Sequence, residues 1–312
     1  MIDVTMRPML LVKSPINLFT YFPSVGADLE VDVVDSAVAV VTGAAGGLGL
    51  GFAESLVSRG MRVVIADIDG DALASAEERL REQGAEVLAV RTDVTEAKSV
   101  MELSARTFDR FGRVDVVCLN AGVSMRGRAW ELSIPDWRWV YDVNVFGVVH
   151  GIRAFVPALL DAGAGHILIT ASNSAATTLA ALAPYVSSKH AVVAVAETLQ
   201  HDLRDVGSGV QVSVVLPGAI RSRMADALRN RPADYGSASI PEDVTRASRA
   251  FLDRFGADPR AMADDVLRHA LDEGRFCIFT DPADAAMLVT HTEALRDGEL
   301  PPVIAPVSQE VK

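Results

Sequence analysis

The stretch AVAVVTGAAGGLGLG, residues 37–51, decides how this chain folds. It begins with an unbroken apolar run, which is typical of a strand that is covered on both faces. The glycines that follow permit a sharp turn and let a pyrophosphate approach the backbone closely. The helix predicted after them offers free N–H groups to phosphates. We therefore expect a strand, a turn and a helix that bind a dinucleotide, and a merely structural turn is the alternative.

Similar short apolar runs recur along the chain, at 62–66, 86–90, 114–119, 166–170, 210–216 and 275–279. Helical patterns occur at 47–59, 71–83, 96–111, 136–160, 184–206 and 261–273. Strands that alternate with helices imply a parallel sheet with helices on both sides. The sequence thus predicts an α/β chain with a single-domain Rossmann fold, whose doubly wound, mainly parallel seven-stranded sheet carries helices on both faces.

The chain divides into three parts by composition. Residues 1–36 hold three prolines and an acidic patch, and we interpret them as an N-terminal extension. Residues 37–300 form the predicted catalytic domain, and 301–312 an irregular tail. Within the domain the pattern loosens at about 218–260, after a predicted strand end. Because ligands bind beyond the carboxyl ends of such strands, we expect a substrate lid there, and a functionless surface excursion is the alternative.

Composition excludes several classes of partner. The net charge of −12 and the pI of about 5.0 disfavour nucleic acid. The two cysteines lack a metal-ligand spacing, the histidines form no metal motif, and we expect no metal. No apolar run has the pattern of a membrane span, and the apolar stretch after Met9 is too short for a signal peptide. We expect a cytoplasmic protein that binds no membrane.

Asp67 is the residue that points to the choice of cofactor. It follows the second apolar run and lies 20 residues after Gly47. A carboxylate there accepts hydrogen bonds from the adenosine ribose hydroxyls and repels a 2′-phosphate. Positions 44–46 and 68 carry no Arg or Lys that would attract that phosphate. We predict NAD (NADH) in preference to NADP, and the alternative is that Asp67 caps the next loop.

The segment YVSSK, residues 185–189, carries the chemistry. Tyr185 and Lys189 are four residues apart and share one face of a helix. The ordinary pKa of a tyrosine, about 10, is too high for a good base near neutrality. A nearby ammonium favours the phenolate and lowers the pKa of the phenol. Taken alone, the pair also fits a solvated helix face.

Several motifs together resemble the short-chain dehydrogenase/reductase family. They are TGxxxGxG from residue 42, TDV at 92–94, LNAG at 119–122, VNVFG at 143–147, YVSSK at 185–189 and PGAIRS at 217–222, with Ser172 placed 13 residues before Tyr185. The family's usual motifs have Asn at the position of Leu119 and Thr at that of Ser222. The resemblance implies a catalytic set of Asn144, Ser172, Tyr185 and Lys189, although Asn144 also fits a structural amide inside a helix.

The same resemblance implies the residues that bind the cofactor. They are Gly43, Ala45, Gly47, Leu48, Gly49, Asp67, Asp93, Val94, Asn120, Ala121, Gly122, Tyr185, Lys189, Pro217, Ile220 and Ser222. Lys189 would also hold the nicotinamide ribose, Ser172 the substrate oxygen, and Asn144 a water that relays protons to Lys189. Homodimers or homotetramers are common in this family.

The carboxyl-terminal part loosely resembles bacterial Cα-dehydrogenases of lignin-derived aryl ethers, through RPADYG at 231–236 and the segment 255–279. We therefore expect an NAD-dependent oxidoreductase that interconverts a secondary alcohol, bulky and hydrophobic or aromatic, and its ketone. Expected pocket walls are Met125, Leu179, Leu182 and Met224, and Trp130 is a further candidate. The alternatives are a reductase of ketones, oxoacyl thioesters or steroids, and a non-catalytic NAD-binding sensor.

Overall fold

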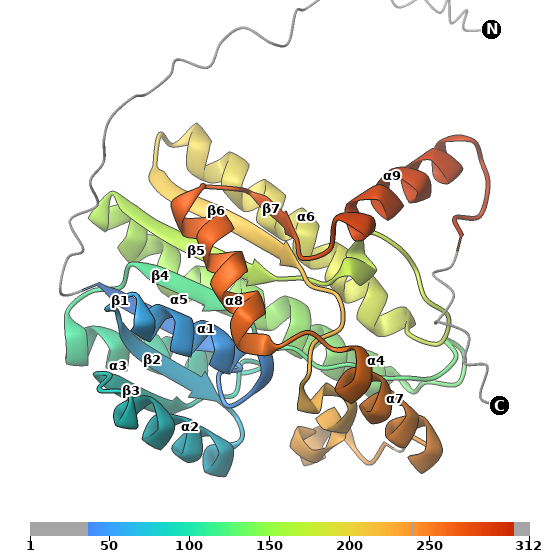
Figure 1. The fold of residues 1–312 in the computed structure, drawn as a ribbon, viewed down its shortest axis with the longest axis horizontal. Coiled ribbons are helices and arrows are strands. Elements are labelled where there is room, and N and C mark those ends of the chain that lie inside the picture. The colour runs from blue at the N-terminus through green and yellow to red at the C-terminus, as the bar shows by residue number, and fades with distance from the viewer. Residues whose placement is uncertain (1–36, 239, 303–312) are drawn as a thin grey trace, which may run out of the picture. The chain divides into compact units, whose positions relative to one another are not determined.

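A computed structural model describes residues 37–238 and 240–302 of the chain (Figure 1). The predicted extension, 1–36, and the tail from 303 onward lie outside the described residues. The predicted fold is confirmed: all seven strands are parallel and their order is β3-β2-β1-β4-β5-β6-β7. The strands are β1 (Val38–Thr42), β2 (Arg62–Asp67), β3 (Val87–Arg91), β4 (Val116–Leu119), β5 (Ala164–Thr170), β6 (Gly209–Leu216) and β7 (Cys277–Phe279).

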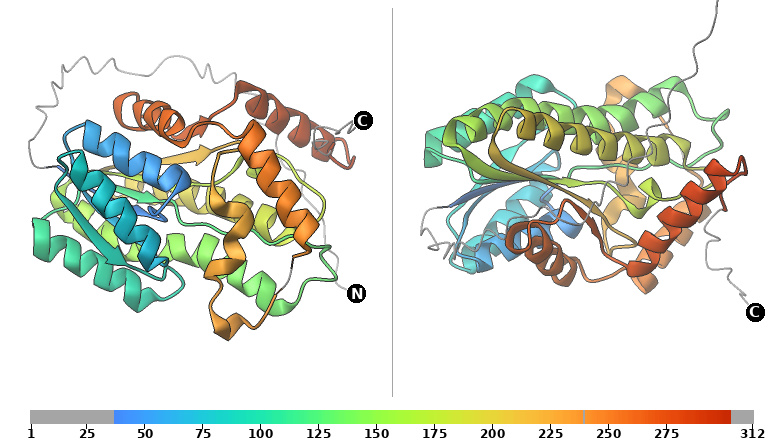
Figure 2. Two further views of the ribbon diagram at one scale, coloured as in Figure 1. Left: turned by 60° about the horizontal axis from the view of Figure 1, so that its bottom comes forward. Right: turned by 90° about the horizontal axis from the view of Figure 1, so that it is seen from above.

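Helices cover both faces of the sheet, as Figure 2 shows when the molecule is seen from above. One layer holds α3 (Ala97–Phe111), α5 (Gly147–Ala162) and α6 (Ala183–Asp205). The other holds α1 (Gly47–Ser58), α2 (Gly70–Glu82) and α8 (Pro259–Leu267). Neighbouring residues of β1 go to opposite layers, because side chains alternate along a strand. Val38 and Val40 pack with the first layer, and Ala39 and Val41 with the second.

The helix expected at 136–160 is divided by a π-helical turn. Helix α4 (Ile134–Tyr141) begins at a capping box, in which Ser133 and Asp136 exchange hydrogen bonds with each other's backbone. The π turn η1 (Asp142–Phe146) then separates α4 from α5. Such turns insert one residue into a helix and occur frequently at functional sites. Here the inserted turn carries Asn144.

By length and composition alone, one helical run among the described residues, Ile134–Ala162, is apolar enough to cross a membrane. It comprises α4, η1 and α5. Its side chains Val140, Val148 and Phe155 are buried in the core between the sheet and the helix layer that contains α5. Core helices satisfy the same length and composition test, and this one packs as a core helix.

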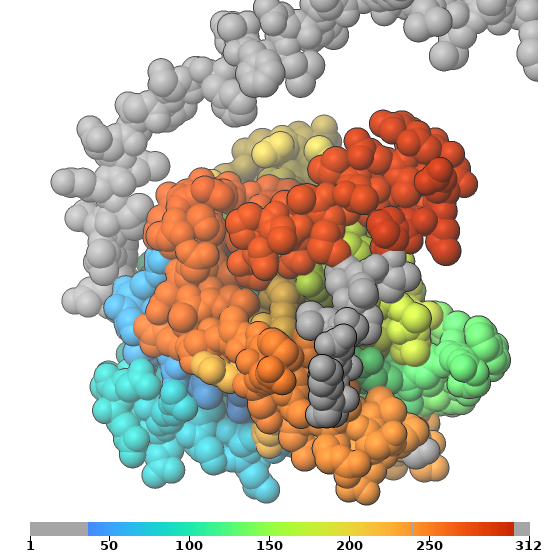
Figure 3. All heavy atoms as spheres, turned by 45° about the vertical axis from the view of Figure 1, so that its right-hand side comes forward, coloured from blue at the N-terminus to red at the C-terminus, as the bar shows by residue number. Residues whose placement is uncertain are grey.

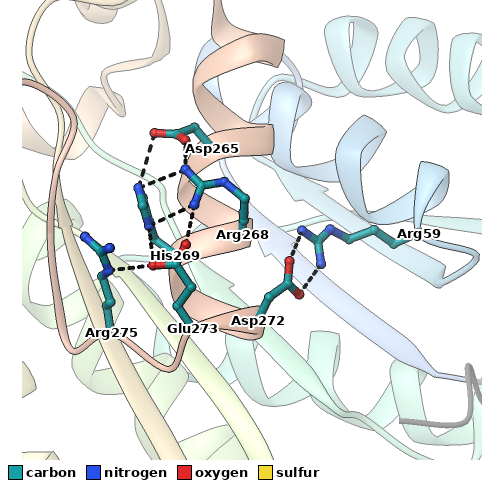
Figure 4. A network of polar contacts seen from close by, with 7 residues as sticks. All are labelled: Arg59, Asp265, Arg268, His269, Asp272, Glu273 and Arg275. Atoms are coloured by element: carbon teal, nitrogen blue, oxygen red, sulfur yellow. Dashed lines mark hydrogen bonds and ion pairs between the residues drawn. The ribbon is translucent and has the colours of Figure 1, made fainter. Parts of the chain in front are cut away.

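Helices α1 and α8 approach each other closely and fix the start of α1. A Cβ added at Gly51 would lie 2.5 Å from the carbonyl oxygen of Pro259, so only glycine permits this approach. Outside the contact lies an exposed polar network drawn in Figure 4. In it Arg59, which follows α1, binds both carboxylate oxygens of Asp272 in the π turn η5 (Arg268–Asp272). Helix α1, which follows the glycine turn, is thus held by α8 and η5 from the later part of the domain.

The region of the predicted lid consists largely of short helices. It comprises the 3₁₀ segments η3 (Arg223–Asn230) and η4 (Ala233–Tyr235) and the helix α7 (Glu242–Phe255). Orange atoms of this region lie on the face shown in Figure 3, between a patch of cyan atoms from earlier in the chain and a patch of green atoms from its middle. A further helix, α9 (Pro282–Arg296), follows β7 and was not expected from the sequence.

Candidate active site

The carboxyl ends of the strands open into a cavity of about 1230 Å³. The chain order reverses between β1 and β4, and in open α/β sheets ligands bind at such a switch point. Pockets for single small ligands usually measure about 300–1000 Å³. This cavity therefore has room for a dinucleotide together with a second molecule.

The glycine turn forms a cradle that a side chain would fill. Gly43 and Gly47 have φ angles of +66° and +53°, a conformation that disfavours residues with a Cβ. A Cβ on Gly43 would lie 2.8 Å from the Cα of Ala121, and one on Gly46 would meet no atom within 4 Å. Helix α1 begins here without a side-chain cap. Its free N–H groups and open approach fit a pyrophosphate.

Asp67 both lines the cavity and braces the neighbouring loops. Its carboxylate accepts hydrogen bonds from the backbone N–H groups of Ala45, at 3.1 Å, and Asp69, at 3.0 Å. Burial raises the pKa of this carboxyl above its ordinary value, and the two hydrogen bonds oppose that rise. The loop-bracing alternative is thus observed, while lone pairs remain for ribose hydroxyls.

Two lid arginines reach the same end of the cavity, which sequence reasoning missed. The guanidiniums of Arg223 and Arg229 lie 3.3 and 3.7 Å from a carboxylate oxygen of Asp69. The sequence-based prediction considered a cation only at positions 44–46 and 68, next to the glycine turn and Asp67. Arg223 and Arg229 lie more than 150 positions further along the chain. Their charge is balanced by the pair of carboxylates Asp67 and Asp69.

Lys189 is a buried cation beside the predicted catalytic tyrosine. Its side chain is 2% exposed, and its ammonium donates a hydrogen bond of 2.8 Å to the carbonyl of Thr170 at the end of β5. The ammonium lies 5.9 Å from the centre of the Tyr185 ring. Burial lowers the pKa of Lys189 from 10.5 to about 8. The two side chains share a helix face, as their spacing predicts.

The pKa of Tyr185 differs from the sequence-based expectation. Burial raises the pKa of its phenol above 10, and hydrogen bonding with the Ser172 hydroxyl only partly opposes this. The lowering by Lys189 that the sequence predicted is not seen in the protein alone. The reason is that removal of the phenolate from water outweighs the nearby hydroxyl. At neutral pH, Tyr185 therefore carries its proton in this state.

Ser172 belongs to a chain of hydrogen bonds that the sequence did not reveal. Its hydroxyl accepts from the backbone N–H of Ser174 at 3.1 Å and donates to the side-chain oxygen of Asn173 at 3.3 Å. The amide of Asn173 then donates to Asp284, at 3.2 Å. Asp284 comes from the unexpected helix α9 and is 8% exposed. Through Asp284 and Asn173, helix α9 thus helps to hold the Ser172 side chain in place.

Asn144 makes structural contacts with all of its side-chain polar groups. Its oxygen accepts from the Val123 N–H at 2.8 Å, and its nitrogen donates to the Val123 carbonyl and to the Ser188 hydroxyl. It is fully buried and does not line the cavity. A Cβ on Gly122 would lie 3.4 Å from both the Asn144 oxygen and the Lys189 nitrogen, so the two residues are neighbours. The structural alternative accounts for its side chain, and a water-holding role stays a prediction.

The other predicted site residues converge on one cavity. Of the predicted cofactor residues all except Gly49 line it, and so do Ser172, Tyr185 and Lys189. Gly49 lies under the turn, where a Cβ would be 2.1 Å from the Gly43 carbonyl oxygen, so its part is packing. The assigned roles of the lining residues stay predictions.

The substrate side of the cavity agrees in part with the expected walls. Leu179, Leu182 and Met224 line it. Met125 does not, because its side chain is 2% exposed and packs in the core. Trp130 is 80% exposed and also lies outside the lining, whereas Trp139 is both buried and part of the lining.

Arg231 anchors the lid beside the π turn. It is 4% exposed at its side chain and pairs with Asp136 of α4 at 2.9 Å. Its guanidinium lies over the Trp139 ring and donates to the Tyr235 carbonyl at 2.6 Å. The Tyr235 hydroxyl donates in turn to Asp142 of η1, at 2.8 Å. A buried cation thus fixes one end of the lid to the turn that carries Asn144.

A family model described as short chain dehydrogenase matches residues 37–233. A 1-deoxy-11-beta-hydroxypentalenate dehydrogenase of Streptomyces avermitilis is 40% identical over 80% of this chain and 86% of its own. A C alpha-dehydrogenase of a Sphingobium species is 28% identical over 85% and 87%. A crystal structure of a short chain dehydrogenase/reductase from Burkholderia phymatum in complex with NAD has a TM-score of 0.81 at 39% identity, and the match covers 88% of this chain and 98% of that one.

Proposed function

The chain belongs to the short-chain dehydrogenase family, and from that premise we propose that it is an NAD-dependent oxidoreductase that interconverts a bulky, hydrophobic or aromatic secondary alcohol and its ketone. The observation that carries this proposal is the convergence of Ser172, Tyr185 and Lys189 in the cavity that the glycine turn borders. A relative named for a hydroxylated substrate supports an alcohol, and one solved structure in complex with NAD supports the cofactor.

The residues present fit a dinucleotide. The open cradle at Gly43–Gly47 and the uncapped start of α1 would hold the pyrophosphate, and Asp67 the adenosine ribose. Lys189 and Tyr185 would hold the nicotinamide ribose. When bound, the oxidised cofactor accepts the hydride and brings a positively charged ring that favours the phenolate of Tyr185. The remaining chemistry is carried by side chains of this chain.

In alcohol oxidation the proton at the substrate oxygen must leave as the hydride leaves the carbon. The Tyr185 oxygen takes that proton, and the Ser172 hydroxyl turns its own proton from Asn173 to the substrate oxygen, on which charge changes. Lys189, with a pKa of about 8, is mostly an ammonium at neutral pH and stabilises the phenolate that receives the proton. In the reverse reaction the same tyrosine returns its proton to the ketone.

Preference for NAD rests on the carboxylate of Asp67. Its position at the end of β2 supports bonds to both ribose hydroxyls and disfavours a 2′-phosphate. Arg223 and Arg229 bring positive charge to this end, but each faces Asp69. Because cellular NAD is mostly oxidised, this preference favours alcohol oxidation.

Ketone reduction is the second candidate, and one observation favours it. The raised pKa of Tyr185 keeps the phenol protonated in the protein alone, which suits donation of a proton to a carbonyl. A reductase of bulky ketones, oxoacyl thioesters or steroids would use the same residues.

We also propose a cytoplasmic location, no nucleic-acid or membrane partner, and assembly as a homodimer or homotetramer. The acidic net charge supports the absence of a nucleic-acid or membrane partner. Size-exclusion chromatography with light scattering measures the assembly, and a monomer at micromolar concentration would refute it.

The function is tested by following NADH absorbance with a panel of secondary alcohols. The panel contains aryl glycerol ethers, steroid alcohols and polyols, each offered with NAD and with NADP. We expect turnover of bulky apolar alcohols with NAD, and little with polyols. Binding of NAD without turnover of any alcohol, and without reduction of any matching ketone, would favour the sensor alternative and refute an enzyme.

A further inference from the structure

Arg126 is a cavity residue that the proposed chemistry does not use. It lies in the loop after β4, four residues beyond Gly122. The backbone around it is fixed, because Met125 is buried in the core and the Gly127 N–H donates to the Ala181 carbonyl at 3.0 Å. The Arg126 side chain thus reaches the cavity from a well-anchored position.

Among the arginines that line the cavity, Arg126 differs in having no carboxylate partner. Arg223 and Arg229 face Asp69, and Arg249 pairs with Asp226. Within 37–238 and 240–302, no residue lies within ion-pair or hydrogen-bond distance of the Arg126 guanidinium. Even Arg128, two residues on and outside the lining, pairs with Glu131 and lies over Trp130.

Arg126 is an exposed residue that lines the cavity. Its side chain is accessible to solvent, yet desolvation by the surrounding protein lowers its pKa below the ordinary value. A guanidinium keeps its charge under these conditions. Partial removal of a cation from water has a cost that a bound anion offsets, and a planar fork suits a carboxylate through two parallel hydrogen bonds.

The position of Arg126 places this charge on the substrate side of the cavity. Gly122 borders the Lys189 ammonium, and four residues of chain span at most about 14 Å. The bond from Gly127 to Ala181 joins the loop to the segment that holds Leu179 and Leu182, the apolar walls. The phosphate cradle touches this loop at Ala121, five residues before Arg126, and the part of the loop beyond Arg126 is tied to Ala181 instead.

We propose that Arg126 binds a carboxylate at the end of the substrate remote from the reacting carbon. The substrate class is then a hydroxy acid, or the corresponding oxo acid, whose bulky apolar body lies against Leu179 and Leu182. This inference rests on the proposed function and adds to it the charge of the substrate.

The test compares phenyl-substituted oxo acids of increasing chain length with their methyl esters, reduced with NADH. The wild type should prefer the best acid over its ester by about 10- to 100-fold in kcat/KM, the effect of one charge-assisted bidentate pair. In Arg126→Gln this ratio should fall towards one, and in Arg126→Lys it should fall in part. The matched control Arg128→Gln should keep the wild-type ratio. Because acid and ester are compared within each variant, a loss of folded enzyme cancels.

Calorimetric titration of the same compounds into the enzyme–NADH complex provides a readout without turnover. If the enzyme binds acids more tightly than esters and Arg126→Gln abolishes this preference, the anion site is supported. If, in addition, no alcohol or ketone is converted, the proposed function is refuted while the anion site stands. Equal acid-to-ester ratios in wild type and Arg126→Gln, or no acid preference at any chain length, would overturn the proposal. The absence of an acid preference at any chain length is the result expected if a carboxylate of the lid pairs with Arg126 during turnover.

Discussion

Replacement of Lys189 by methionine should change how the stability of the protein depends on pH. Methionine fills a similar volume and does not titrate. In the wild type, burial lowers the pKa of Lys189 from 10.5 to about 8. At about 1.4 kcal/mol per pKa unit, this lowering means that the buried ammonium destabilises the folded protein by about 3 kcal/mol.

The direction follows from which state holds the proton. Below about pH 8 the folded and unfolded chains both carry it, and the full cost of burying the ammonium is present. Between about pH 8 and 10.5 the folded protein loses the proton first, so the cost disappears as pH rises. The wild type therefore gains about 3 kcal/mol of unfolding free energy relative to Lys189→Met between about pH 7.5 and 10.5.

Urea unfolding of both proteins at several pH values measures this difference. Other titrating groups are common to the two proteins and cancel, provided that protein concentration is the same. Loss of the 2.8 Å hydrogen bond to Thr170 shifts the difference by a constant, which is set below about pH 8, where Lys189 is charged in both states, and which cancels when values at different pH are compared. A difference that stays constant within about 1 kcal/mol over this range would refute the claim that Lys189 is held in a desolvated site.

Two further substitutions test the cofactor end and the lid. Asp67→Ser should raise the NADP-to-NAD ratio of kcat/KM by about 10- to 100-fold, because the 2′-phosphate no longer meets a repelling carboxylate and can face Arg223 and Arg229. Asp71→Asn, an exposed control on α2, should leave this ratio unchanged. An equal change of the ratio in both variants would contradict the role of Asp67 in cofactor choice. Arg231→Met leaves Asp136 buried without its cationic partner, and it should lower the unfolding free energy by about 3–5 kcal/mol and raise KM. Arg249→Met, an exposed control in the lid, should unfold at nearly the same urea concentration as the wild type. Equal destabilisation by the two substitutions would show that Arg231 does not anchor the lid.

The sheet and the first half of the site could be predicted because their signals are local. Each strand is a continuous apolar run, and the glycine turn follows its strand directly, so position along the sheet edge follows from topology. The Tyr185–Lys189 pair needs only a helical spacing of four. These features require no knowledge of contacts between distant segments.

The parts that were missed depend on burial or on distant contacts. Whether the pKa of Tyr185 rises or falls depends on how much water the fold removes, which residue types do not reveal. Arg231 and Asp136 are 95 positions apart, and Asn173 and Asp284 are 111 apart. Helix α9 lacks a marked apolar stripe, and the π turn at Asp142–Phe146 leaves the helical pattern around it almost unchanged.

Tyr185→Phe tests the central claim most directly, since it removes a single oxygen from the cavity. With the alcohol that the panel identifies, kcat/KM should fall by about 10²–10⁴-fold, the usual contribution of a positioned acid or base. NADH binding, followed by fluorescence titration, should weaken by no more than about tenfold, because only the hydroxyl that faces the nicotinamide ribose is lost while the cradle, Asp67 and Lys189 are kept. Tyr141→Phe, a tyrosine of α4 outside the cavity lining, is the matched control and should keep wild-type turnover. Turnover by Tyr185→Phe within about tenfold of the control would contradict proton transfer by this residue.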